Sequence, residues 1–228
     1  MADRSLPVRS EPAGAVPSEA DFTPVGHIYD RIAAAYAGRF GDDLKPGSGD
    51  RAFLDVALAS ARGSGPVLDL GCGPGQIAAI AIAAGMPAIG TDISPGMLAV
   101  ARRWVPLGVF LRADVRALPL AAASCRAAAA FYLLHHLPAP ALPGVLAELH
   151  RVLEPGGTLV IATHLGSGHQ WVTGEWNGVT EQVAIACYGK DELAGHVAAA
   201  GFSVESVGSR APRADEFQAE HGFLRARA

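Results

Sequence analysis

Hydrophobic and polar residues follow two alternating patterns along most of the chain after residue 65. Short apolar runs, typical of strands buried on both faces of a sheet, are followed by segments with apolar residues three or four positions apart, as on one face of a helix. The short runs predict strands at residues 66–70, 87–92, 108–112, 127–132, 157–163, 202–207 and 223–227. The longer segments predict helices at residues 75–84, 95–103, 139–152 and 190–200. This alternation predicts βαβ units and a doubly wound α/β fold.

The rest of the chain divides into segments of different composition. Residues 1–23 are rich in Pro, Ala and Ser and have no apolar stretch like that of a secretory signal, so we expect a disordered tail. Residues 24–62 show helical spacing on both sides of a Gly- and Pro-rich break at 45–49, and they precede the main domain at 63–228. Within that domain, the unusually long connection at 165–188 predicts an insertion on the substrate side.

A glycine-rich turn follows the first predicted strand of the main domain. Gly71, Gly73 and Gly75 come directly after an apolar run that contains Asp69, and the next helix begins beside them. Glycine permits a sharp turn and a close backbone approach to a ligand, while the start of the helix offers free N–H groups. The dinucleotide-binding pattern G-x-G-x-x-G would place its third glycine at Gln76, but the spacing here is G-x-G-x-G. The turn therefore predicts a cofactor site that departs from the dinucleotide pattern.

A second acidic residue ends the next predicted strand. Asp92 lies about twenty residues past the glycine turn, where a carboxylate can accept hydrogen bonds from ribose hydroxyls in a nucleoside-binding doubly wound fold. Its alternative role is to cap the helix that begins after Ser94. The position alone does not separate one nucleoside cofactor from another.

Composition limits the class of protein and its partners. Half of the 228 residues are hydrophobic, which is a globular composition, and the formal net charge of −4 gives no general attraction to nucleic acid. No apolar run approaches the roughly 20 residues of a membrane span. Cys72, Cys125 and Cys187 show neither metal-site nor disulfide spacing. We therefore expect a cytoplasmic monomer or homodimer that acts on a small molecule, with no nucleic-acid or membrane partner.

Five short motifs, taken in order, resemble the small class I S-adenosylmethionine-dependent methyltransferases of the bacterial small-molecule type. They are V-L-D-L-G-C-G-P-G at 67–75, the strand that ends in Asp92, R-A-D-V at 112–115, A-F-Y-L-L-H-H-L-P at 130–138 and L-E-P-G-G at 153–157. The resemblance implies a Rossmann-like seven-stranded sheet with an antiparallel last strand. It also implies S-adenosylmethionine as the cofactor and S-adenosylhomocysteine as its product.

The same resemblance assigns roles to the matching residues. Those implied for cofactor binding are Tyr29, Tyr36, Asp69, Gly71, Gly73, Gly75, Asp92, Ile93, Ala113, Asp114, Val115 and Phe131. The glycines would line the methionine and ribose part, Ile93 would pack on the adenine, and Asp114 would accept a hydrogen bond from the adenine amine. Phe131 lies where the family contacts the methionine moiety. Buried strand ends are usually apolar and aspartate is common in loops, so these residues also have purely structural interpretations.

The resemblance further implies an N-terminal helical lid over residues 24–62. Tyr29 and Tyr36 are seven residues apart and share one face of a predicted helix. In the family, such a tyrosine pair closes over the cofactor. The alternative is that both rings only pack the helix onto the domain.

Histidines follow the carboxyl ends of two predicted strands. His135 and His136 come after the strand at 127–132, and His164 comes after the strand at 157–163. Ligands bind at this edge of doubly wound sheets, and a neutral imidazole can accept a proton near neutral pH. His136 and His164 are therefore candidate catalytic bases, with helix capping or loop hydrogen bonds as the alternative. Consecutive histidines diverge and no cysteine has ligand spacing to them, so we expect no metal.

These observations predict transfer of a methyl group from S-adenosylmethionine to an oxygen, nitrogen or carbon nucleophile of a small molecule. Trp171 and Trp176 would form an aromatic cap suited to an organic acceptor, or would only anchor a loop. Enzymes that methylate base or glutamine nitrogens carry an Asn/Asp-Pro-Pro-Tyr run where this chain has Phe131-Tyr132-Leu133-Leu134. Two alternatives remain: an S-adenosylmethionine-binding protein that catalyses a different reaction, and an NAD(P)-dependent oxidoreductase, against which the glycine spacing argues.

Overall fold

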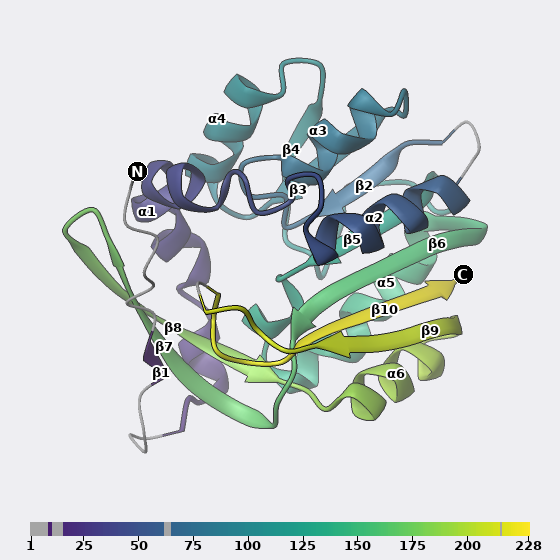
Figure 1. The fold of residues 1–228 in the computed structure, drawn as a ribbon. Helices are drawn as coiled ribbons and strands as arrows, with labels where there is room; N and C mark the ends of the chain where they lie inside the picture. The colour runs from purple at the N-terminus through teal and green to yellow at the C-terminus, as the bar shows by residue number, and fades with distance from the viewer. Residues whose placement is uncertain (1–8, 11–15, 62–64, 215) are drawn as a thin grey trace.

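A mixed sheet of seven strands organises the protein in the computed structural model, which describes residues 9–10, 16–61, 65–214 and 216–228 (Figure 1). The strand order is β4-β3-β2-β5-β6-β10-β9. The strands are β2 (Val67–Leu70), β3 (Ala88–Asp92), β4 (Val109–Arg112), β5 (Cys125–Phe131), β6 (Leu153–His164), β9 (Ser203–Arg210) and β10 (His221–Arg227). The neighbours from β4 to β6 pair in parallel, and β10 pairs antiparallel with both β6 and β9. The predicted doubly wound sheet with an antiparallel last strand is confirmed.

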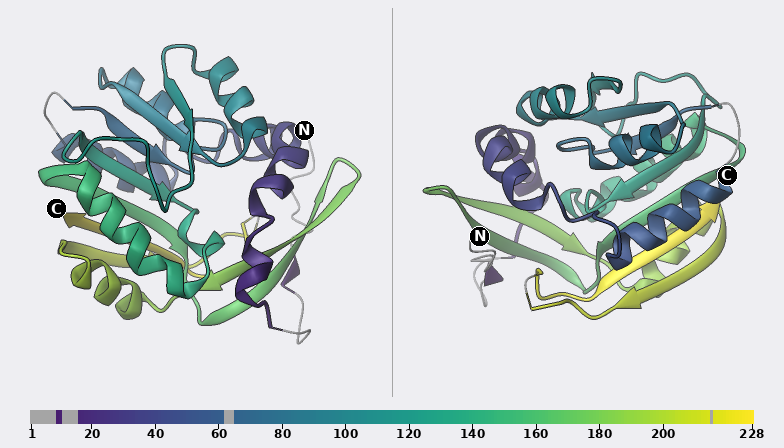
Figure 2. Two further views of the ribbon diagram at one scale, coloured as in Figure 1. Left: turned by 180° about the vertical axis from the view of Figure 1, so that it is seen from behind. Right: turned by 45° about the horizontal axis from the view of Figure 1, so that its top comes forward.

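Helices cover both faces of this sheet, as Figure 2 shows from two further sides. One face carries α2 (Gly49–Ser60), α3 (Gln76–Ala83) and α4 (Pro95–Trp104), and the other carries α5 (Leu142–Val152) and α6 (Lys190–Ala199). Successive side chains of a strand point to opposite faces. Val67 therefore packs in the core under α2, α3 and α4, whereas Leu68 and Leu70 pack in the core under α5 and α6. Burial on both sides explains why the central strands are continuous apolar runs.

The helix boundaries follow local signals. Ser94 caps α4, since its side-chain oxygen accepts a hydrogen bond from the Met97 N–H at 3.1 Å, and Pro95 occupies the first turn. The helix predicted at 139–152 divides into a short 3-10 turn, η3 (Ala139–Ala141), and α5. Element type was thus predictable where the apolar spacing is regular.

A second, three-stranded sheet is formed largely by the long connection before α6. Strands β7 (Gly168–Trp176) and β8 (Val179–Cys187) form an antiparallel hairpin, and β1 (Arg9–Ser10) pairs with β7. Asn177 and Gly178 make the turn with positive φ values of 50° and 87°, as a two-residue hairpin turn requires. An insertion was predicted here from the sequence but the two strands were not, although the Asn-Gly pair was the signal for them.

The N-terminal part contains the 3-10 helix η1 (Glu19–Phe22), α1 (Val25–Phe40) and α2. Helix α1 lies beside the hairpin and the carboxyl edge of the sheet, whereas α2 packs on the sheet itself (Figure 1). The expected disordered tail falls largely on residues 1–8 and 11–15, outside the described residues, and so does the expected boundary between residues 62 and 63. Of the rest of that segment, Phe22 is buried in the core. In the described part of the chain, no helix is both long and apolar enough to cross a membrane.

Candidate functional site

A cavity of about 280 Å³ lies at the carboxyl ends of β2, β5 and β6. The glycine turn, α1, the β7–β8 hairpin and the loop before β10 form its walls. It brings together the predicted residues Tyr29, Tyr36, Asp69, Gly71, Gly73, Phe131, His136 and His164. The predicted residues that do not line it are Gly75, Asp92, Ile93, Ala113, Asp114 and Val115. The carboxyl edge of the sheet is where ligands bind in doubly wound folds, so this cavity is the candidate site.

The glycines of the turn serve different purposes. Gly71, Gly73 and Gly75 all have positive φ values, of 64°, 49° and 87°. A Cβ on Gly71 would lie 2.7 Å from a Leu133 methyl group, so glycine is required there by protein packing. A Cβ on Gly73 would meet no protein atom within 4 Å, and Gly73 lines the cavity. The turn therefore leaves open space at Gly73, which a bound molecule can fill.

Asp69 is a buried acid at the base of this turn. Its Oδ2 accepts a hydrogen bond from the Ala78 N–H in α3 at 3.0 Å. Burial raises the pKa of Asp69 to about 8, and the nearby Asp92 adds to that increase. No described residue donates a hydrogen bond to Oδ1, and Asp69 lines the cavity. A cationic group of a ligand placed beside Asp69 would favour the ionised form of this carboxyl, which can then accept a hydrogen bond from it.

Asp92 supports the glycine turn from the neighbouring strand. Its two oxygens accept hydrogen bonds from the Gly73 and Ser94 N–H groups, each at 2.9 Å. Helix α1 closes over this strand end, because Asp30 accepts hydrogen bonds from Ser94 Oγ at 2.6 Å and from the Gly96 N–H at 2.8 Å. Burial raises the pKa of Asp92, although the backbone hydrogen bonds oppose the increase. Asp92, which was predicted to bind the ribose hydroxyls, thus lies under α1.

The predicted adenine contacts also lie along this edge, outside the cavity. Ile93 is partly exposed, and one of its methyl groups would be 3.1 Å from a Cβ placed on Gly26 of α1. Asp114 forms a 2.5 Å ion pair with Arg116, whose hydrogen bonds lower the pKa of the carboxyl. Its neighbours Ala113 and Val115 are buried in the core.

The tyrosines of α1 face the cavity and meet the hairpin. The Tyr36 ring stacks on Trp176 with centroids 5.6 Å apart, and the Tyr29 hydroxyl is 2.8 Å from Nε2 of His136. Arg31 binds both oxygens of Glu181 in β8, at 2.5 and 2.6 Å. Helix α1 and the hairpin are therefore clasped together over the cavity.

We expect Arg31→Ala to loosen this clasp. Hydrogen exchange should accelerate in α1 and in β8, because a bidentate pair no longer joins them, while the unfolding temperature changes little since the guanidinium is largely exposed. Exchange measured by mass spectrometry tests this, with Arg103→Ala on the solvent side of α4 as the control. Unchanged exchange in both elements would show that Arg31 does not hold them together.

The three predicted histidines lie side by side at the inner end of the cavity. His135 and His136 belong to the 3-10 helix η2 (Leu134–His136), and their Nε2 atoms are 3.1 Å apart. His164 ends β6, and its ring centroid is 5.2 Å from that of His135. Burial lowers the pKa of His136 to about 4 and that of His164 to about 3. These imidazoles are neutral at physiological pH.

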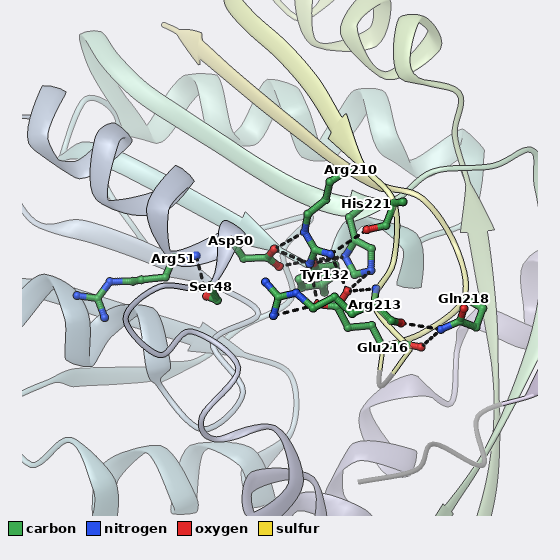
Figure 3. Close-up of polar contacts among 10 residues, drawn as sticks. Ser48, Asp50, Arg51, Tyr132, Arg210, Arg213, Glu216, Gln218 and His221 are labelled. Atoms are coloured by element: carbon green, nitrogen blue, oxygen red, sulfur yellow. Dashed lines mark hydrogen bonds and ion pairs between the residues drawn. The ribbon is translucent and has the colours of Figure 1, made fainter.

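A buried polar network that the sequence analysis missed borders the same end (Figure 3). The Tyr132 hydroxyl donates to Asp50 in the first turn of α2 and is 2.7 Å from Nδ1 of His221. Arg210 in β9 holds Asp50 at 2.8 Å and Glu216 at 2.6 Å. All of these residues except Arg210 line the cavity. Tyr132 has a positive φ of 53°, which is rare for a residue with a side chain and concentrates at functional sites.

No local sequence signal points to this network, because its members lie far apart along the chain. In the described residues, no group of three or more His, Cys, Asp or Glu side chains is arranged to hold a metal ion. The site is therefore a partly enclosed cavity with an open glycine turn at one end and neutral imidazoles at the other.

Known proteins resemble this chain in sequence and in fold. Residues 67–157 match the family described as "Methyltransferase domain". Malonyl-[acyl-carrier protein] O-methyltransferase of Enterobacter lignolyticus is 32% identical over 127 residues, which cover 56% of this chain and 50% of that protein. Trans-aconitate 2-methyltransferase of Methylobacterium nodulans is 40% identical over 134 residues, covering 57% of this chain and 48% of that protein. The chain thus spans about half the length of the curated relatives it matches.

Among solved structures, the likeness extends over the whole chain. The 1,6-didemethyltoxoflavin-N1-methyltransferase of Burkholderia thailandensis, solved with 1,6-didemethyltoxoflavin and S-adenosylhomocysteine bound, has a TM-score of 0.70 and 21% sequence identity. The alignment covers 100% of this chain and 97% of that one. At this identity the likeness shows a common fold.

Proposed function

We propose that this chain, whose residues 67–157 match the methyltransferase domain family, is a class I S-adenosylmethionine-dependent methyltransferase that transfers a methyl group to a small-molecule nucleophile. The observation that carries the proposal is the cavity that joins the glycine turn to a ring-lined inner end. Such a shape provides one place for a cofactor and an adjoining place for an acceptor.

The residues at the glycine turn fit the methionine half of the cofactor. The open space at Gly73 admits a ligand against the backbone, and the free oxygen of Asp69 can receive its ammonium group. Phe131 lies beside them at the end of β5. When bound, the cofactor supplies a methyl group made electrophilic by the sulfonium.

The nucleoside half is proposed to bind along β3 and β4. Asp92 would hold the ribose, Ile93 would pack on the adenine, and Asp114, between Ala113 and Val115, would accept from the adenine amine. Since α1 lies over this edge, α1 must shift when the nucleoside binds. Of the predicted lid at 24–62, α1 is therefore proposed to move, whereas α2 stays packed in the core through Leu54, Ala57 and Leu58.

The protein's own contribution to the reaction is alignment and exclusion of water. Tyr29, Tyr36 and Trp176 close the cavity from the α1 and hairpin side, so the acceptor is held between them and the imidazoles. Positioning two reactants in this way can contribute roughly 7–11 kcal/mol in favourable cases.

The candidate catalytic histidines differ in their freedom to meet an acceptor. Nε2 of His136 is already within hydrogen-bond distance of Tyr29 and His135. His164 has no hydrogen-bond partner among the described residues, and it lines the cavity. We propose that His164, rather than His136, contacts the acceptor; a role for either as a base stays a prediction.

Calorimetry with S-adenosylhomocysteine and with NADH tests the proposed cofactor. We expect saturable binding of S-adenosylhomocysteine, no heat from NADH, and release of S-adenosylhomocysteine from S-adenosylmethionine when an acceptor is present. Binding of NADH alone would favour an oxidoreductase, and cofactor binding without methyl transfer to any acceptor would favour the non-transfer alternative.

The location and assembly of the protein belong to this proposal as well. Cys72, Cys125 and Cys187 are free thiols, which is consistent with a cytoplasmic protein. A monomer or homodimer stays a prediction.

A further inference from the structure

Four histidine rings form a continuous cluster at the inner end of the cavity. Centroids are 4.2 Å apart for His135 and His136, 5.2 Å for His135 and His164, and 5.0 Å for His164 and His221. No carboxylate among the described residues forms a hydrogen bond with any of these rings; the nearest contact is Glu216, 3.6 Å from Nε2 of His221. Burial lowers the pKa of all four. The four imidazoles are therefore neutral at physiological pH.

The hydrogen-bond pattern assigns the proton of His164. Nδ1 of His164 is buried without a partner, as are Nδ1 of His135 and Nδ1 of His136. A buried N–H without an acceptor is rarer than an unpaired acceptor atom, so the His164 proton belongs on Nε2. The Nε2 atoms of His135 and His136 are 3.1 Å apart and form a hydrogen bond with each other. Nε2–H of His164 has no protein acceptor and is the donor that the cluster offers to the cavity.

The other ionisable groups around the inner end are neutral or already paired. Burial raises the pKa values of Tyr29 and Tyr36, so both phenols keep their protons. The carboxylates Asp50 and Glu216 are held by Arg210 (Figure 3).

A cation lies at the rim of the same end. The Arg213 side chain is 49% exposed and lines the cavity, and its ion pair with Glu216 is long, at 3.9 Å. It can attract an anion toward the cavity without a short ion pair having to break.

From this arrangement we propose that the methyl acceptor is an organic acid bound as its anion, with the ionised group accepting a hydrogen bond from Nε2–H of His164. This inference rests on the proposed methyl transfer and specifies its substrate class. The ionised oxygen forms the new bond to the methyl carbon, and the carbon–sulfur bond breaks with its electron pair staying on sulfur. The sulfonium and the anion become a neutral thioether and a neutral ester or ether, and no proton moves.

The charge balance is the reason to prefer an anion over a neutral amine or alcohol. A neutral acceptor would leave a positive charge on the product or release a proton beside the imidazole cluster. Charges of one sign are costly in such a partly enclosed, low-dielectric space, whereas neutralising a pair is favourable. An anionic acceptor also needs no base, which agrees with the low basicity of His164.

Benzoate and benzamide form a matched pair of probes, since they differ mainly in charge. Calorimetry on the protein saturated with S-adenosylmethionine, and on the protein alone, should show benzoate binding at least tenfold more tightly than benzamide in both, which is a difference of roughly 1.4 kcal/mol. Equal or tighter binding of benzamide, or no binding of benzoate, would overturn the proposal. S-adenosylmethionine affinity is measured first, so a failure of the cofactor proposal is seen separately.

Two variants assign the preference to His164. His164→Gln keeps an N–H donor and should retain most of the benzoate preference, whereas His164→Leu should abolish it, both with unchanged affinity for S-adenosylmethionine. His27→Leu, on the exposed side of α1, is the control and should behave as the wild type. A preference that survives in His164→Leu would show that another group recognises the anion.

Discussion

Gly73→Ala should weaken S-adenosylhomocysteine binding by about 100-fold while the protein remains folded. The added methyl group meets no protein atom within 4 Å, so it projects into the space proposed for the cofactor. Intrusion of a methyl group into a close contact typically costs about 1–3 kcal/mol, and roughly 1.4 kcal/mol corresponds to a tenfold change in affinity. Titration calorimetry gives the affinity, and a thermal melt shows that the fold is intact.

Gly85→Ala is the matched control for this variant. Gly85 follows α3, has a positive φ of 79°, and would also have open space around an added methyl group. Both substitutions therefore carry a similar backbone strain of roughly 1 kcal/mol, but only Gly73 lines the cavity. Equal cofactor affinity in the two variants would show that the cofactor does not bind at the glycine turn.

Arg210→Met should destabilise the protein by about 3–5 kcal/mol. The substitution leaves Asp50 without its cation and Glu216 with only the long ion pair to Arg213. The place is largely buried, since the side chains of Arg210, Asp50 and Glu216 are 21%, 10% and 22% exposed. Urea unfolding at pH 7 measures the loss. Arg116→Met, which breaks an exposed pair with Asp114, should cost no more than about 1 kcal/mol. A loss for Arg210→Met as small as that of this control would contradict the role given to the network.

The loss of unfolding free energy in Arg210→Met should depend on pH. Burial by itself would raise the pKa of Glu216, but hydrogen bonds from Arg210 and from the Arg213 N–H lower it to about 2. A carboxyl whose folded-state pKa is lowered contributes stability that is present above its unfolded pKa, near 4.5, and is lost as the pH falls toward 2. The difference between wild type and Arg210→Met should therefore be full at pH 6 and shrink as the pH falls from about 4.5 to 2.

The sheet and its helices were predictable because their signals are local. Central strands such as β2 are mainly apolar since both faces are covered, with Asp69 as the exception in β2. The helices α4 and α5 are marked in the sequence by regularly spaced apolar residues. The glycine turn was predictable for the same reason. Gly71 and Gly73 have positive φ values, which glycine adopts readily, so the residue type itself marks the turn. The hairpin was missed although Asn177-Gly178 marked it.

The inner end of the site was not predictable, because tertiary contacts create it. Tyr132 meets Asp50 across 82 residues, and Arg210 meets Asp50 across 160 residues. Nothing near Asp50 in the sequence distinguishes it from an ordinary acid in the first turn of a helix. Likewise, the covering of Asp92 by α1 depends on the hydrogen bonds of Asp30, which only the folded chain brings into place.

The most direct test of the central claim is a crystal structure of this protein with S-adenosylhomocysteine. We expect the methionine half against Gly71 and Gly73 with its ammonium group at Asp69, the ribose at Asp92 with α1 displaced from its present position, and the sulfur facing the cavity toward His164. A ligand bound elsewhere, or a ribose that does not contact Asp92, would contradict the account of this site.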